Sequence, residues 1–227
     1  MRQNESMPAA SKPLDVFQDL HLRGPASASA TLHRALKDNA VGPWRYAAEK
    51  EEQLRALGEQ GTALAFERAA TPGFYAAGLV LVSASDGMEV ANIVPREISE
   101  LGYRAYNATL EDFAERVARP AARIAGYRVD LSRSTLQLDD EVPLNVGEAL
   151  RRFSALANKS TGASHPLDRD RWFDFIILAH RSGARLDAST LARWLSESEG
   201  WPEDEARDLA GEYERARELL ARFAASA

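Results

Sequence analysis

Hydrophobic and polar positions show two different periodicities along this chain. Between residues 64 and 131 apolar residues form short runs and alternations typical of strands, whereas after residue 145 they recur at helical spacing. The pattern predicts an α+β fold. We expect a small, mostly antiparallel sheet with helices, in the order β-β-β-α-β, followed by a C-terminal four-helix region.

The strands of this sheet are expected at residues 64–67, 75–83, 88–94 and 127–131. The second and third are joined by Ala84-Ser85-Asp86-Gly87, in which the Asp-Gly pair tolerates the positive φ of a hairpin turn. The run Leu79-Val80-Leu81-Val82 is apolar on both faces and indicates a central strand covered on both sides. An amphipathic helix over 110–124 should be kinked at Pro120, which has no backbone N–H to donate.

The chain before residue 64 gives weaker signals. Residues 1–30 mix Pro, Ser and Ala with polar residues and predict a flexible N-terminal segment. It contains an apolar patch that can dock on the body of the protein or on a partner, made of Leu14, Val16, Phe17, Leu20 and Leu22. A short helix is expected at 31–39, and Pro43 suits the first turn of a second helix at 44–57.

A polar connection from Ser132 to Asn145 indicates a boundary between two subdomains. The predicted organisation is a flexible segment at 1–30, an α+β subdomain at 31–138 and a helical subdomain at 139–227. The four helices are expected at 147–157, 168–182, 187–199 and 202–224. The second of them is apolar nearly all round, which predicts a position at the centre of the bundle.

Composition narrows the classes of protein that fit. The 227 residues include no cysteine, which excludes disulfides, thiolate catalysis and Cys-ligated metals. The apolar stretch from Phe74 to Val82 is far too short to span a bilayer, and residues 1–13 lack the apolar core of a secretory signal. We therefore expect a cytoplasmic protein with no membrane partner.

The charge distribution bears on possible partners. The net charge of −6 argues against nucleic acid as a ligand, because binding phosphates requires a basic surface. Residues 145–185 hold seven Arg or Lys against four Asp or Glu, whereas residues 186–227 hold five against ten. A basic surface beside an acidic one and ordinary solvated helix faces both explain this difference.

The most unusual segment, 158–172, lies between the first two C-terminal helices. It has small polar residues, a histidine and several charges just before the N-terminus of an apolar helix, where free N–H groups can bind an anion. His165 is the candidate acid–base residue. The candidate ligand-binding residues are Asn158, Lys159, Ser160, Thr161, Arg169 and Arg171. The alternative is an ordinary loop with Asp168 as the N-cap of the helix, and the spacing of a phosphate-binding loop is absent.

Metal and cofactor chemistry finds no support in the motifs. The four histidines are His21, His33, His165 and His180, and no two of them lie three or four residues apart. Neither a G-x-S-x-G nor a G-x-G-x-x-G sequence is present. We expect no metal and no cofactor, and whether the protein is an enzyme stays open.

Three stretches carry a resemblance to known sequences. They are Met88 to Pro95, Tyr106 to Phe113, and Arg152 through His165-Pro166-Leu167-Asp168 to Trp172. Together they resemble a family of uncharacterised bacterial proteins, over a region from about Gly78 to the C-terminus. The resemblance implies a bacterial, cytosolic setting and no particular activity.

These observations leave competing functional hypotheses. The first is a protein-interaction module of an accessory, immunity-like or antitoxin-like kind, since charge is segregated and no chemical motif is present. The alternative is a phosphate- or nucleotide-binding protein, or an enzyme, that uses the 158–171 loop. A nucleic-acid regulator is a third hypothesis, and the overall acidity argues against it.

Overall fold

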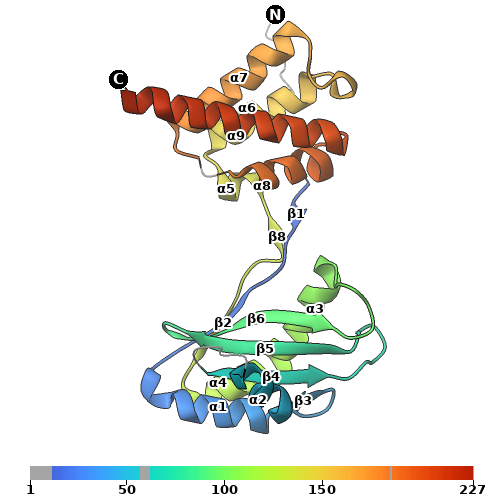
Figure 1. Ribbon diagram of the computed structural model, residues 1–227, viewed down its shortest axis with the longest axis vertical. Coiled ribbons are helices and arrows are strands. Elements are labelled where there is room, and N and C mark those ends of the chain that lie inside the picture. Colours follow the sequence, from blue (N-terminus) through green and yellow to red (C-terminus); the bar gives the residue numbers. More distant parts are fainter. Residues whose placement is uncertain (1–11, 57–61, 185, 227) are drawn as a thin grey trace, which may run out of the picture. The chain divides into compact units, whose positions relative to one another are not determined.

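The computed structural model describes residues 12–56, 62–184 and 186–226, and these form two compact units (Figure 1). Residues 15–134 make one unit, which we call the α+β unit. Residues 12–14 and 135–226 make the other, which we call the helical unit. The α+β unit is therefore inserted into the sequence of the helical unit. The chain returns to the helical unit between residues 134 and 135, inside the polar connection predicted at 132–145.

The α+β unit is built on a six-stranded sheet in which every neighbouring pair is antiparallel. In spatial order the strands are β3 (Trp44–Tyr46), β4 (Ala63–Arg68), β5 (Ala77–Ala84), β6 (Gly87–Pro95), β2 (Leu20–Arg23) and β7 (Arg128–Leu131). This sheet confirms the α+β class and the β-β-β-α-β order. It also contains two strands that the sequence pattern did not predict, β2 and β3.

Strand β2 replaces part of the flexible segment expected through residue 30. Leu20 and Leu22 are fully buried, whereas His21 and Arg23 lie on the other face. The backbone of β2 pairs with β6 at one edge and with β7 at the other. Two short helices follow it, η1 (Ala26–Ala28) and α1 (Ser29–Asp38). Residues 1–11 of the predicted flexible segment lie outside the described residues.

The helix expected at 44–57 is wrong over its first turn. Residues 44–46 form β3 and pair with β4, and the helix α2 begins only at Ala48 and runs to Ala56. Packing explains the difference, because the Trp44 ring is buried edge-on against Phe113 at a centroid distance of 5.0 Å. Residue 57 lies outside the described residues.

Helices cover one face of the sheet (Figure 1). Helix α3 (Tyr103–Phe113) continues through a π-helical turn at Ala114–Ala118 into α4 (Arg119–Ala125). Pro120, at which the sequence predicts a kink, lies in the first turn of α4, directly after that π-helical turn. The core between sheet and helices includes Leu79, Leu81 and Phe113, while Val80 and Val82 on the opposite face are only half-buried.

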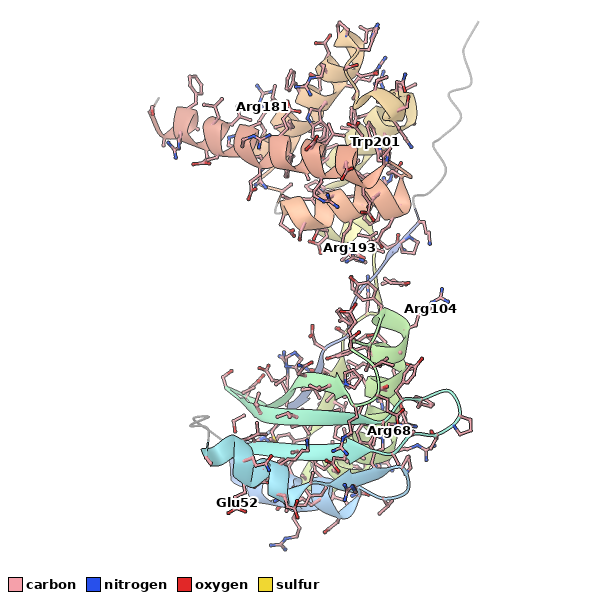
Figure 2. The ribbon with its side chains drawn as sticks, turned by 45° about the vertical axis from the view of Figure 1, so that its right-hand side comes forward. Glu52, Arg68, Arg104, Arg181, Arg193 and Trp201 are labelled. Carbon is pink, nitrogen blue, oxygen red and sulfur yellow. The ribbon has the colours of Figure 1, made fainter. Side chains whose placement is uncertain are left out.

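A buried charge pair ties the sheet to α3. Arg68, labelled in Figure 2 at the end of β4, donates from Nε to Asp112 Oδ2 at 3.1 Å. Trp44 donates from Nε1 to the same oxygen at 2.8 Å, and Arg116 donates to Oδ1 at 2.7 Å. Burial raises the pKa of Asp112, but these hydrogen bonds outweigh it, and the pKa is lowered.

The helical unit confirms the predicted C-terminal four-helix region. Its elements are β8 (Thr135–Leu136), α5 (Leu138–Glu141), α6 (Leu144–Leu156), α7 (Pro166–Arg181), α8 (Ala188–Arg193) with a π-helical turn at Trp194–Ser198, and α9 (Glu203–Ser226). Strand β8 pairs with β1 (Leu14–Asp15). Helix α7 is not enclosed as expected: Trp172 is buried, but Phe173 and Ile177 are 42% and 37% exposed.

Candidate functional site

Side chains at the start of the 158–172 segment make hydrogen bonds within the protein. Asn158 Oδ1 accepts from Ser160 N at 3.1 Å and from Ser160 Oγ at 2.8 Å, which caps the short helix η3 (Lys159–Thr161). Thr161 Oγ1 donates to the Asn158 carbonyl at 3.3 Å. Lys159 Nζ donates to the carbonyl oxygen of Glu199. These four candidate ligand-binding side chains therefore stabilise the loop itself.

His165 and Asp168 organise the start of α7. His165 is the N-cap residue, with Nδ1 accepting from Leu167 N at 3.2 Å, so the cap lies three residues before the one expected at Asp168. Asp168 is buried; it accepts from Asn158 N at 3.2 Å and from Arg171 Nη1 at 2.8 Å. The free N–H groups that an anion would use are thus partly occupied by the chain.

Arg169 links two helices. Its guanidinium donates two hydrogen bonds to the carboxylate of Glu212 on α9, which raises the pKa of Arg169. Trp172 Nε1 donates to the same carboxylate at 3.2 Å, and the guanidinium lies 4.7 Å from the centroid of Phe173. The Glu212 carboxylate thus accepts from both Arg169 and Trp172, and the guanidinium also packs on the Phe173 ring. This is the arrangement of a structural ion pair.

Arg171 lines a surface cavity between α6 and α7. The cavity has a volume of about 400 Å³ and is lined by Asn145, Glu148, Ala149, Arg152, Phe153, Arg171 and Asp174. Two arginines and two carboxylates therefore share one hollow. The structure brings Arg171 to this hollow, whereas the contacts of Lys159, His165 and Arg169 hold those side chains to other parts of the helical unit.

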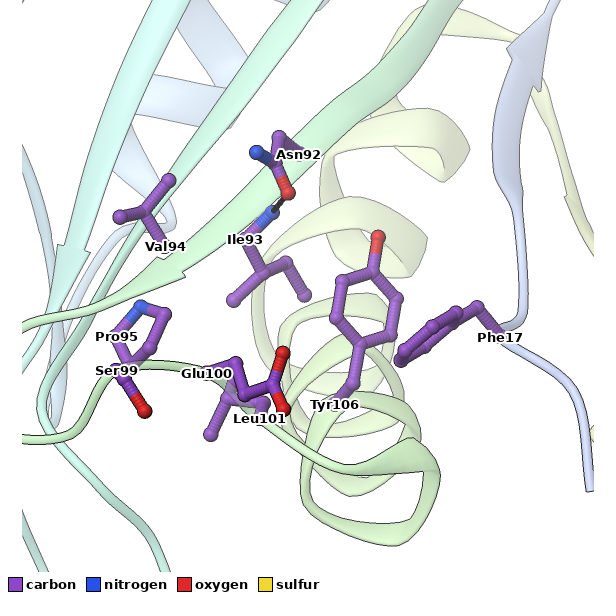
Figure 3. A pocket seen from close by; sticks show the side chains of 9 residues that line it. All are labelled: Phe17, Asn92, Ile93, Val94, Pro95, Ser99, Glu100, Leu101 and Tyr106. Carbon is purple, nitrogen blue, oxygen red and sulfur yellow. Dashed lines mark hydrogen bonds between the residues drawn. The ribbon is translucent and has the colours of Figure 1, made fainter.

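A second cavity of about 390 Å³ lies in the α+β unit, beside the end of β6 (Figure 3). Its lining residues are Phe17, Asn92, Ile93, Val94, Pro95, Ser99, Glu100, Leu101 and Tyr106. The Tyr106 ring stands between Ile93 of β6 and Phe17 (Figure 3). Phe17 contacts it edge-on at a centroid distance of 4.9 Å and contacts Tyr103 at 4.4 Å. We call this cavity the β6 groove.

The groove exists because the chain before β2 turns away from β6. Strand β2 pairs with β6 only at residues 87–89 of β6. The preceding residues bond elsewhere: Asn107 on α3 accepts from Gln18 N at 2.9 Å and donates to the Val16 carbonyl at 2.8 Å. Asp19 N donates to Ser132 Oγ at 2.7 Å. Phe17 is held in this segment with 48% of its surface exposed, although it is a large apolar side chain.

Among the described residues, the one charged side chain that lines the β6 groove is acidic. Glu100 is the carboxylate among its lining residues, and Figure 3 shows it beside Tyr106. Burial, and to a lesser extent the charge of Asp19, raises the pKa of the Tyr106 hydroxyl, so this group remains a hydrogen-bond donor at neutral pH. No Lys or Arg lines the groove among the residues that the structure describes.

Part of this site was visible in the sequence. The apolar patch at Leu14, Val16, Phe17, Leu20 and Leu22 was expected to dock on the body or on a partner, and Leu14, Leu20 and Leu22 are fully buried in the body. Phe17 is the member left half exposed. The other side of the groove was not predicted, because nothing in the local pattern shows that residues 90–95 lie beside Phe17.

A metal-binding cluster and a membrane-spanning helix are both absent from the described residues. In the described ranges, no cluster of three or more His, Asp or Glu side chains is arranged so that it could hold a metal ion. Among the same residues, no helix combines the length and the apolar character that crossing a membrane requires.

Comparison with known proteins shows that part of the helical unit is similar to a family model. Searches of the curated proteins and of the solved structures gave no match. Residues 144–221, from the start of α6 into α9, match the family model described as a domain of unknown function (DUF1889). The match includes the Arg152 to Trp172 stretch and leaves the other two stretches of the resemblance outside. It confirms the resemblance to an uncharacterised family for this part of the chain, to which no function is assigned.

Proposed function

We propose that this chain is a cytosolic, bacterial protein-interaction module that binds another protein through the β6 groove. An accessory, immunity-like or antitoxin-like role fits such a module. The observation that carries the proposal is the half-exposed Phe17 ring, held beside a partly apolar groove rather than in the core. Exposed aromatic side chains in a formed hollow are typical anchors of protein interfaces.

The way Phe17 is held supports a binding role. Its backbone neighbours are fixed by the buried amide of Asn107, so the ring is presented in one place without a partner. A side chain ordered in advance loses less conformational entropy on binding than a mobile one does. The mixed lining of Ile93, Leu101 and Tyr106 with Asn92 and Glu100 also resembles an interface more than a core.

Site-specific photo-crosslinking in the native host tests this proposal. We would place p-benzoyl-phenylalanine at position 17 and, as the matched control, at position 223, where Phe223 of α9 is 72% exposed. We expect one stoichiometric adduct with a second polypeptide from position 17, and a different pattern from position 223. No adduct at position 17, or the same background adducts at both positions, would show that the groove does not bind a protein.

The alternative, a phosphate or nucleotide site in the helical unit, has one supporting observation. Arg152 and Arg171 line the same hollow, and Arg152 is exposed with no ion pair among the described residues. Thermal-shift measurements with inorganic phosphate and with nucleotides test it, because a ligand of the native state raises the melting temperature. A shift that is lost in Arg152→Ala and kept in Arg207→Ala would favour this function, and no shift would oppose it.

A further inference from the structure

We infer that the partner of the β6 groove is an extended segment that adds to β6 as an antiparallel or parallel strand, and that it carries apolar residues alternating with Lys or Arg. This inference rests on the proposed function and specifies how the same groove recognises its partner. It follows from the free edge of β6, from the shape of the groove and from its charge.

One edge of β6 is only half used. On the β5 side the strand is paired along its whole length, from Gly87 to Pro95. On the β2 side pairing stops at Glu89, and no other strand among the described residues pairs with 90–95 there. An edge of this kind presents N–H and C=O groups that can pair with another chain.

One backbone N–H group of this edge is placed by the pairing with β5. Arg96 N donates towards β5, to the Ala76 carbonyl at 3.0 Å. Because successive N–H groups of a strand face opposite edges, the N–H of Ile93 faces the groove. It donates to the side chain of its own neighbour, Asn92 Oδ1, at 2.8 Å. The Asn92 side chain therefore occupies the place that a carbonyl of an added strand would take.

The groove lies where a strand would continue the sheet. In the β2–β6 pairing the residue numbers step in opposite directions, so a continued ladder would place Phe17 opposite Ile93. Instead residues 16–19 are bonded to α3 and Ser132, and the Tyr106 ring stands between Phe17 and Ile93 as part of the groove wall. The Tyr106 hydroxyl is a protonated donor in the groove. An added strand can therefore pair with β6 and place one side chain against Tyr106 and Leu101.

Two features of β6 limit uncontrolled pairing. The ladder with β5 shifts register at Ala91, which forms a bulge, and Pro95 has no N–H to offer. The Asn92 side chain in addition occupies the Ile93 N–H. Together these features leave only a few backbone N–H and C=O groups around Ile93 for pairing. Such an edge accepts a short segment with a suitable side chain and discourages general aggregation.

The charge of the groove selects the side chains of the partner. Glu100 lines it, and the charge of Asp19 acts on Tyr106 from nearby, with no basic side chain lining the groove to balance them. Arg96, the nearest basic residue in sequence, is paired with the buried Glu67. A segment that carries Lys or Arg beside its apolar anchor is therefore complementary to this surface.

Selection from a displayed library of random ten-residue peptides on the full-length protein tests the inference first. We expect enriched peptides in which apolar residues alternate with Lys or Arg. No enrichment, or enrichment of peptides without the alternation or without basic residues, would overturn the inference. The matched control is selection on Phe17→Ala, which should lose the enriched class because the aromatic wall is absent.

Backbone methylation of an enriched peptide then tests strand addition itself. N-methyl groups are placed on alternate residues in two sets, one for each edge of the peptide. We expect one set to weaken binding roughly ten-fold or more and the other to have little effect, since only one edge can pair with β6. If neither set weakens binding, or both do so equally, the peptide does not bind as a strand.

A substitution on β6 gives an independent readout with opposite sign. Asn92→Ala removes the internal acceptor of the Ile93 N–H and should strengthen peptide binding roughly two- to ten-fold, the net value of one hydrogen bond. Asn145→Ala, an exposed asparagine in the helical unit, is the control and should change nothing. Unchanged or weaker binding by Asn92→Ala would contradict pairing at Ile93.

Failure of this inference can be told apart from failure of the proposed function. A specific photo-adduct at position 17, combined with a peptide that binds equally well when either edge is methylated, leaves the interaction module standing and removes strand addition. Absence of the photo-adduct removes the interaction module whatever the peptides do.

Discussion

The side-chain oxygen of Asn107 lies 2.9 Å from the backbone nitrogen of Gln18, and this hydrogen bond holds the chain away from β6. Asn107 is buried, and its amide nitrogen also donates to the carbonyl of Val16 at 2.8 Å. One side chain on α3 thus replaces two bonds that a neighbouring strand would supply. The open side of the β6 groove depends on it.

Asn107→Leu should therefore destabilise the α+β unit. The substitution keeps the volume of the side chain but leaves Gln18 N–H and Val16 C=O without partners, at a cost of about 2 kcal/mol or more in the free energy of unfolding. Hydrogen exchange checks this, because amide protection around residues 16–23 should fall. Asn145→Leu, at an exposed position, should change stability by less than about 0.5 kcal/mol. Unchanged protection in Asn107→Leu would contradict the role of this bond.

Arg68→Met should be more damaging than removal of a surface charge. Arg68 is buried, and without it the Asp112 carboxylate loses its buried cation, at a cost of roughly 3–5 kcal/mol. Urea unfolding measures the loss. The control is Arg207→Met, whose exposed pairs with Glu203 and Asp204 should be worth less than about 1 kcal/mol. Equal effects of the two substitutions would show that the Arg68–Asp112 pair stabilises no more than a surface pair.

The Arg169–Glu212 pair should act on stability and not on anion binding. In a double-mutant cycle of Arg169→Ala and Glu212→Ala, we expect a coupling of about 1 kcal/mol in the free energy of unfolding, because the pair is partly exposed. Arg169→Ala should also leave any response to phosphate unchanged, since the guanidinium is already bonded to a carboxylate. No coupling, together with a lost phosphate response, would return Arg169 to the ligand-binding residues.

Acid should weaken the helical unit through Asp187, the N-cap of α8. Burial raises the pKa of this carboxyl, but hydrogen bonds from Ser189 and Thr190 outweigh it, and the pKa is lowered to about 2. Because the folded pKa lies below the unfolded one, the stabilisation is present above about pH 4 and is lost as pH falls towards 2. Melting temperature measured across that range should fall less steeply in Asp187→Asn, which keeps an acceptor but does not titrate. An identical slope in the two proteins would contradict this.

The sequence predicted the elements whose signals are local. The hairpin of β5 and β6 follows from its Asp-Gly turn, and the C-terminal helices follow from apolar spacing over many residues. It did not predict β2 and β3, because each is at most four residues long and its pairing partners lie far away in the chain. For β3 the burial of Trp44 against Phe113 overrides a local pattern that favours a helix.

The candidate site shows the same division. The 158–171 segment has the composition of a binding loop, but whether Arg169 faces a ligand or Glu212 depends on a residue more than forty positions later. The β6 groove brings together Phe17 from the β1–β2 connection, Ile93 from β6 and Tyr106 from α3. Sequence spacing identified the apolar patch around Phe17, and only the fold shows what lies opposite it.

The position of β2 in the sheet order has a consequence for how this protein is made. The strand sits between β6 and β7, and His21 pairs with Glu89 on one side and with Asp130 on the other. At ordinary translation rates the ribosome needs on the order of ten seconds to proceed from residue 21 to residue 130. During that time the sheet that buries Leu20 and Leu22 is incomplete, because β7 has not yet been synthesised. Contacts between residues so distant in sequence also make folding slow.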